Sequence, residues 1–139
     1  MKIMKIMERS ERGQSLVELA ISLVILLYLL SGAVEFGIAF FQFVQLRDAA
    51  QEGALFGSMQ PSNTAGIVAR IQGASNSPID LTTITPVISY SGAQCEGNAI
   101  TVSLTYNHQV FMPFMSKFIG STLPLTATVT DTILSPVCP

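Results

Sequence analysis

The sequence has 139 residues, of which 49 % are apolar, and a formal net charge of −2. That length provides one modest domain and an anchor helix. The negative net charge argues against a basic surface for nucleic acid, so no nucleic-acid partner is expected.

The charges are segregated along the chain. Residues 1–13 carry a balance of +2, and the remainder carries −4. Positively charged flanks of a membrane segment stay in the cytoplasm. We therefore expect residues 1–13 to be a basic cytoplasmic leader and the C-terminal part to be exported.

Residues 14–58 are predicted to form one long helix. From Leu16 to Val44 the strongly polar residues are only Glu18, Glu35 and Gln42. Apolar residues on every face indicate a membrane span, and the run approaches the roughly 20 residues that a bilayer needs. The whole helix would be about 67 Å long at about 1.5 Å per residue. Its first half would span the membrane, and its second half must leave the bilayer and pack on another part of the structure.

That second half carries a stripe of small residues at i, i+4 and i+8. Small side chains let another helix approach closely. The predicted helix-packing positions are Ala49, Gly53 and Gly57.

Residues 59–139 are predicted to form an extracytoplasmic sheet domain with one short helix at 64–75. From residue 79 the apolar period becomes two, as in Ile100, Val102 and Leu104. A small sheet needs a cover, and the amphipathic half of helix 14–58 supplies it. The expected fold class is α+β: a long N-terminal hydrophobic helix packed at its C-terminal half on a small antiparallel β-sheet, as in type IV pilins.

The connection at residues 108–122 is unusually rich in bulky apolar residues. One interpretation is a loop folded back over the open end of the core. The other is an exposed patch that docks a neighbouring subunit.

Two cysteines, Cys95 and Cys138, fall in the exported part. In an oxidising compartment they can pair, and the alternative is two free thiols. We predict a disulfide that fastens the C-terminus to the turn after the first strand.

No catalytic constellation is visible. The single histidine, His108, is interpreted as a surface or hydrogen-bonded residue, and no zinc spacing or phosphate loop is evident. We expect no enzyme activity, no metal and no cofactor.

The chemistry concentrates at the N-terminus. Gly13 separates the basic leader from the apolar run, which indicates a prepilin clipped between Gly13 and Gln14. The new amine on Gln14 would lie about one turn from Glu18, and the two charges attract strongly in a low dielectric. Glu18 of one subunit would pair with the amine of a neighbour and set the register, or else extend to the membrane interface. Glu35 would lie at the outer interface or bond within the filament core.

The motifs around these residues resemble those of the TadE-like proteins. They are the segments 13–18, 32–37 and 47–54, and the sheet region is loosely similar, so the resemblance covers nearly the whole chain. It implies a pseudopilin or minor pilin of the tight-adherence (Flp) branch of type IV pili. It also implies cleavage by a prepilin peptidase after Gly13, with Glu18 as the pilin carboxylate. The implied partners are that peptidase, other copies or other pilin subunits through helix 14–58, and the inner-membrane assembly machinery.

Two other interpretations remain open. A secretory signal would be cut near residues 31–33, although apolar character resumes at Val34. A membrane-anchored extracytoplasmic binding module would keep helix 14–58 as a tether and would not polymerise. The pilin interpretation predicts the bacterial inner membrane first and then the extracellular pilus or cell surface.

Overall fold

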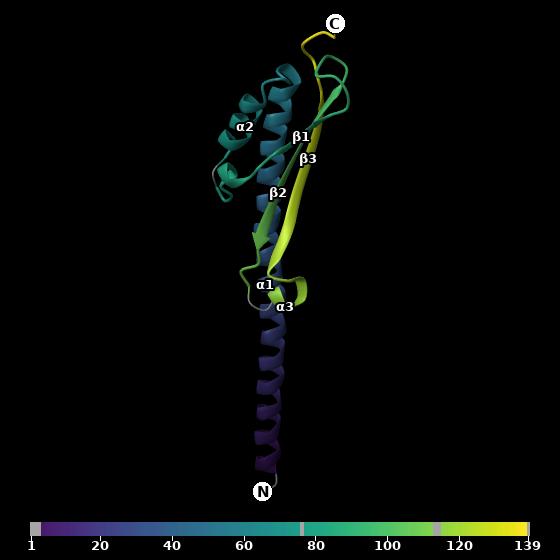
Figure 1. The fold of residues 1–139 in the computed structure, drawn as a ribbon. Helices are drawn as coiled ribbons and strands as arrows, with labels where there is room; N and C mark the ends of the chain where they lie inside the picture. Colours follow the sequence, from purple (N-terminus) through teal and green to yellow (C-terminus); the bar gives the residue numbers. More distant parts are fainter. Residues whose placement is uncertain (1–3, 76, 113–114, 139) are drawn as a thin grey trace.

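The structure is a computed structural model that describes residues 4–75, 77–112 and 115–138, with side chains from Gly13 onward. Its spine is one continuous helix, α1 (Met4–Met59). Figure 1 shows the other elements gathered along the C-terminal half of α1, while its N-terminal half extends alone. The predicted long helix packed on a small sheet domain is confirmed.

The N-terminal boundary of the helix differs from the prediction. The described leader residues, Met4–Gly13, continue the same helix, and α1 ends at Met59, one residue beyond the predicted end. A glycine inside a helix costs only about 1 kcal/mol relative to alanine, and this segment contains no proline. Gly13 therefore does not interrupt the hydrogen-bonded turns of α1, which continues back to Met4.

The buried stripe of α1 begins at Glu35 and ends at Ser58, at a spacing of three to four residues. Leu46, Ala49 and Ala50 are fully buried, and they form one core with the sheet and the second helix. A stripe of this spacing lies on one face of a helix, so α1 covers the sheet along this half.

The second helix, α2 (Thr64–Gly73), packs on the small-residue stripe of α1. Asn63 caps it, because its side-chain oxygen accepts a hydrogen bond from the amide of Gly66 at 3.0 Å. Ile67 and Ile71 are fully buried against α1. The predicted helix is confirmed, and it ends two residues earlier than expected. A short 3₁₀ turn, η1 (Leu81–Thr83), follows.

The sheet has three antiparallel strands in the order β1-β2-β3: β1 (Val87–Tyr90), β2 (Ala99–Gln109) and β3 (Thr122–Thr132). Its inner face carries the buried Ile100, Val102 and Leu104. On its outer face, hydroxyl groups of β2 and β3 pair across the strands at 2.9 to 3.1 Å, in the pairs Thr101–Thr130, Ser103–Thr128 and Thr105–Thr126. The alternation of apolar and hydroxyl residues in the sequence thus corresponds to the two faces of the sheet.

Two further contacts close the end of the domain that is far from the N-terminus. Cys95 and Cys138 form the predicted disulfide, with their Cα atoms 5.1 Å apart. The hydroxyl of Tyr90 donates to the carbonyl of Pro61 at 2.6 Å, and burial raises the pKa of this tyrosine. The C-terminal segment is therefore fixed to the turn between β1 and β2.

We predict that Gly53→Ala destabilises the domain by about 1–3 kcal/mol, because overpacking a filled core displaces its neighbours. A Cβ on Gly53 would lie 2.5 Å from Cγ1 and 2.8 Å from Cδ1 of Ile71. Calorimetry of thermal unfolding in detergent measures the change. Gly73→Ala is the control, because a Cβ there meets no atom within 4 Å. Equal melting temperatures for the two variants would contradict close packing at Gly53.

Candidate functional site: an uncovered helix and a buried polar cluster

From Leu16 to Leu30, α1 is an apolar rod that the other described residues do not cover. Its large side chains are exposed, for example Leu16 at 67 % and Leu29 at 68 %. Within the described residues, Gly13–Met59 is the one helix long and apolar enough to cross a membrane, and its apolar window has no buried residue. Such a surface is stable in lipid or against other apolar helices, and not in water.

Three of the four residues predicted for cleavage and register lie at the start of this rod. Gly13, Gln14 and Glu18 are all exposed on α1. A Cβ built on Gly13 would meet no described atom within 4 Å, so the position is open to another protein. Glu18 stands among exposed apolar side chains, including Val17 at 60 % and Leu19 at 64 %. The structure thus leaves this carboxylate available to a partner outside the chain.

Glu35 has a different environment, because it is buried within its own chain. It is 3 % exposed, and His108, on β2, is 1 % exposed. The Oε1 atom of Glu35 lies 2.8 Å from Nε2 of His108. The other ring nitrogen, Nδ1, lies 2.6 Å from the side-chain oxygen of Gln42. Glu35, Gln42 and His108 form a buried polar cluster between α1 and the end of β2.

The same carboxylate also binds the backbone after β2. Oε1 accepts a hydrogen bond from the amide of Phe111 at 3.2 Å, and Oε2 accepts one from the amide of Met112 at 3.1 Å. A carboxylate bonded by one ring nitrogen and two amides has its charge well compensated. The connection from β2 is thereby tied to α1 where the covered half of the helix begins.

The hydrogen bonds of the cluster are complete in two arrangements. With both ring nitrogens of His108 protonated, the ring donates to Glu35 and to the amide oxygen of Gln42. With a neutral ring, Gln42 presents its NH₂ group to Nδ1 instead. In both arrangements the ring bonds at each nitrogen, so the buried histidine has no orphaned polar atom.

A second buried amide holds α1 to the segment after α2. The side-chain oxygen of Gln45 accepts from the amide of Ile79 at 2.9 Å, and its nitrogen donates to the carbonyl of Ile79 at 2.9 Å. Gln42 and Gln45 are polar residues within the buried stripe of α1. Their hydrogen bonds join α1 to β2 and to the segment after α2.

The small-residue stripe serves intramolecular packing. Gly53 admits Ile71 of α2, and Gly57 admits Ile100 of β2 and Ile67 of α2. Ala49 is fully buried. The helix that approaches this stripe closely is thus α2 of the same chain. Strand β2 also contacts the stripe, at Gly57.

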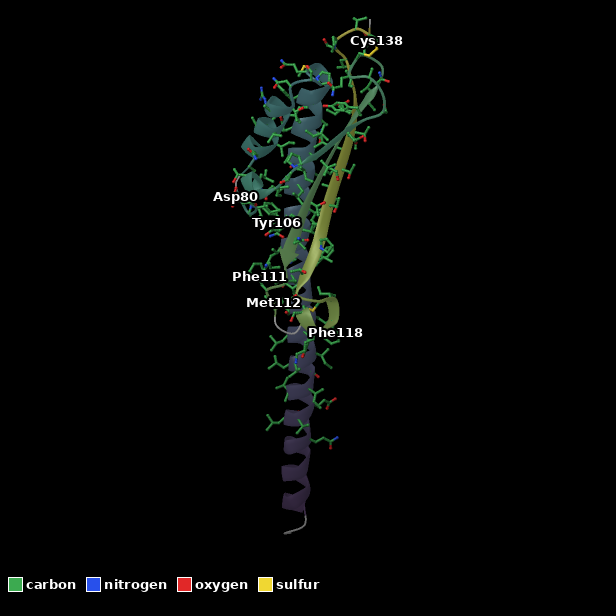
Figure 2. The ribbon with its side chains drawn as sticks, in the orientation of Figure 1. Asp80, Tyr106, Phe111, Met112, Phe118 and Cys138 are labelled. Atoms are coloured by element: carbon green, nitrogen blue, oxygen red, sulfur yellow. A yellow bond between two sulfur atoms is a disulfide. The ribbon has the colours of Figure 1, made fainter. Side chains whose placement is uncertain are left out.

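In the described part of the connection between β2 and β3, the phenylalanine side chains do not fold back over the core. Phe111 is 67 % exposed and Phe118, on the short helix α3 (Ser116–Ile119), is 78 % exposed. Figure 2 shows both at the end of the sheet nearest the uncovered half of α1. The prediction of a core cover is therefore wrong for these side chains, because the tie to Glu35 holds the connection against α1.

Sequence analysis missed the cluster, although its signals are present. His108 has the same parity along β2 as Ile100, Val102 and Leu104, which are all buried. Glu35 and Gln42 are seven residues apart, so they share one face of α1. The described residues contain no group of three or more His, Cys, Asp or Glu side chains that could hold a metal ion.

Residues 13–55 match the family model of the TadE-like proteins. This segment, which lies within α1, is similar to the TadE-like proteins. No curated protein and no solved structure matches the chain. The predicted resemblance is confirmed for residues 13–55. The match ends before Gly57 and the sheet, so the similarity of the sheet region stays a prediction.

We predict that Glu35→Gln loosens the backbone after β2. Removing the charge weakens the bonds of a buried ring and two amides, at a cost of about 1–3 kcal/mol. Hydrogen exchange at Phe111 and Met112 should accelerate about ten- to a hundredfold, because local opening becomes easier. Exchange mass spectrometry of the full chain in detergent measures it. Glu52→Gln, an identical change at an exposed site on α1, should leave these amides unchanged. Unaltered exchange in Glu35→Gln would show that the carboxylate does not hold this segment.

Proposed function

We propose that this chain is a pilin-like structural subunit of a Tad-type (Flp) pilus. It enters the inner membrane through α1, loses its leader after Gly13 and assembles through the helix that begins at Gln14. The observation that carries the proposal is the uncovered apolar half of α1, continuous with a half that is packed in a folded domain. A rod of this kind can exchange lipid for other helices without refolding its domain.

Glu18 supplies the specificity that apolar packing lacks. Apolar side chains attract one another at many registers, since the hydrophobic effect is not directional. A buried charge is tolerated only opposite a partner of the other sign. Cleavage after Gly13 creates such a partner, the α-amine of Gln14, and the match to TadE-like proteins begins at residue 13.

The partners follow from this path. A prepilin peptidase reads the segment around Gly13, and the inner-membrane assembly machinery moves the subunit. Other copies or other pilin subunits pack on the helix, and the domain is finally displayed at the cell surface. The proposed role is structural and not enzymatic.

The alternative is an anchored extracytoplasmic module that does not polymerise. It uses the same membrane span but gives no role to Gly13 or Glu18. The N-terminal sequence of the mature protein separates the two functions, since the pilin begins at Gln14 and a simple tether keeps its leader.

We predict that a bulky substitution, Gly13→Leu, blocks maturation. A peptidase that accepts glycine at this open position would meet a large side chain beside the bond it cuts. The full-length precursor should then accumulate in membranes, as seen by gel mobility and N-terminal sequencing. Gly37→Leu is the control, because a Cβ at this exposed site on α1 also meets no atom within 4 Å. A mature product of normal size from Gly13→Leu would remove the cleavage step from the proposal.

We predict that Glu18→Gln is cleaved normally but is excluded from filaments. Removing one partner of a buried pair costs about 3–5 kcal/mol, whereas in the membrane the side chain reaches the headgroups. The measurement is the ratio of variant in sheared surface filaments to variant in membranes. Glu18→Asp keeps the charge and should restore part of the incorporation. If Glu18→Gln enters filaments as well as the unaltered chain, Glu18 has no role in register.

A further inference from the structure

A collar of exposed apolar side chains surrounds the point where the covered half of α1 begins. Phe36 on α1 is 71 % exposed, and Phe111, Phe118 and Ile119 of the connection are 67 %, 78 % and 46 % exposed. We define these four residues as the collar. Figure 2 places Phe111 and Phe118 on either side of α1 in that view, at the lower end of the sheet.

The position of the collar along α1 is fixed by contacts. The amides of Phe111 and Met112 bond to Glu35, and a Cβ on Gly32 would lie 3.9 Å from the side chain of Met115. Phe111, Met112 and Met115 therefore lie against α1 between Gly32 and Glu35. The height of the collar, meaning its position along the axis of α1, is set by hydrogen bonds from the amides of Phe111 and Met112 to the buried carboxylate of Glu35.

That height coincides with the edge of a bilayer. The apolar rod begins at Leu16, and about 20 residues separate its start from Glu35, or about 30 Å of helix. The hydrocarbon core of a bilayer is also about 30 Å thick. When Leu16 lies at the inner boundary, the collar lies at the outer one.

We propose that the collar is a lipid-binding surface that seats the domain on the outer leaflet of the membrane before assembly. The collar continues the apolar surface of the span, since Phe36 lies seven residues after Leu29 on the same face of α1 and both are exposed. Aromatic and aliphatic side chains on a short amphipathic segment enter the headgroup boundary. Lys117, exposed between Ser116 and Phe118, presents its ammonium group to lipid phosphates.

This inference rests on the membrane-bound stage of the proposed function, and it adds a second role to the cluster of Glu35, Gln42 and His108. By holding Phe111 and Met112, the cluster sets the height at which the domain sits on lipid. Phe40, stacked on Phe36 with ring centroids 6.1 Å apart, extends the apolar surface along α1 toward the domain.

Tryptophan fluorescence tests the collar directly, because the chain contains no tryptophan. Full-length Phe118→Trp and Phe111→Trp are reconstituted separately in vesicles of phosphatidylethanolamine and phosphatidylglycerol. Parallel vesicles carry lipids brominated near the headgroups or near the bilayer centre. We expect blue-shifted emission that loses most of its intensity with the shallow bromines and little with the deep ones.

Two matched variants separate failure of the collar from failure of the anchor. Leu26→Trp, in the uncovered rod, should be quenched most by the deep bromines. Leu134→Trp, 64 % exposed after β3, should not be quenched. If Leu26→Trp is quenched and both collar variants emit like Leu134→Trp, the anchor stands and the collar proposal is overturned. If Leu26→Trp also escapes quenching, both the membrane anchor and the collar proposal are overturned.

A contact between subunits is the other possible use of the collar. Collar tryptophans that are unquenched in vesicles but blue-shifted in sheared filaments would overturn the lipid proposal in favour of that contact. Quenching of the collar variants in vesicles supports the lipid proposal regardless of what the filament later does.

Discussion

The structure depends on one buried carboxylate, because Glu35 connects the anchor to the domain. It binds the ring of His108 and the amides of Phe111 and Met112, so three donors from outside α1 converge on one side chain. A buried charge of this kind is stable only while its partners stay in place. The geometry of the connection from β2 therefore follows from the position of Glu35 on α1. The height of the collar in turn follows from that connection.

The same helix meets two environments, and the change between them is abrupt. Between Gly13 and Gly32 the large side chains of α1 are exposed in the monomer, and from Glu35 onward a stripe of α1 is buried by the sheet and α2. The first half needs lipid or other helices around it, whereas the second half is satisfied within the chain. Polar groups serve different purposes in each half. Glu18 is exposed and makes no ion pair with the described side chains, whereas Glu35, Gln42 and Gln45 are hydrogen-bonded within the chain.

Close approach to the backbone of α1 lets large side chains of the domain pack against it. Gly53 and Gly57 leave room for Ile71 and Ile100, so α2 and β2 both come near the backbone of α1. The outer face of the sheet contributes little apolar burial, since its threonine and serine hydroxyls pair with one another. The core is consequently a single layer between α1, α2 and the inner face of the sheet. Because the core is one layer thick, the domain lies close along α1 and remains thin.

The sequence by itself determined the long helix, the short second helix, the alternation of the strands and the α+β class. These features follow from local periodicity, and periodicity is visible in a chain before it folds. The tertiary structure alone decided which polar residues are buried together. His108 and Glu35 are 73 residues apart, and their contact depends on the register of β2 against α1. Gly13 is a second case that the tertiary structure decided. The composition of the sequence changes at this residue, yet the backbone remains helical because nothing local forces a break. Pairings over long separations depend on packing, and no single segment of the sequence encodes them.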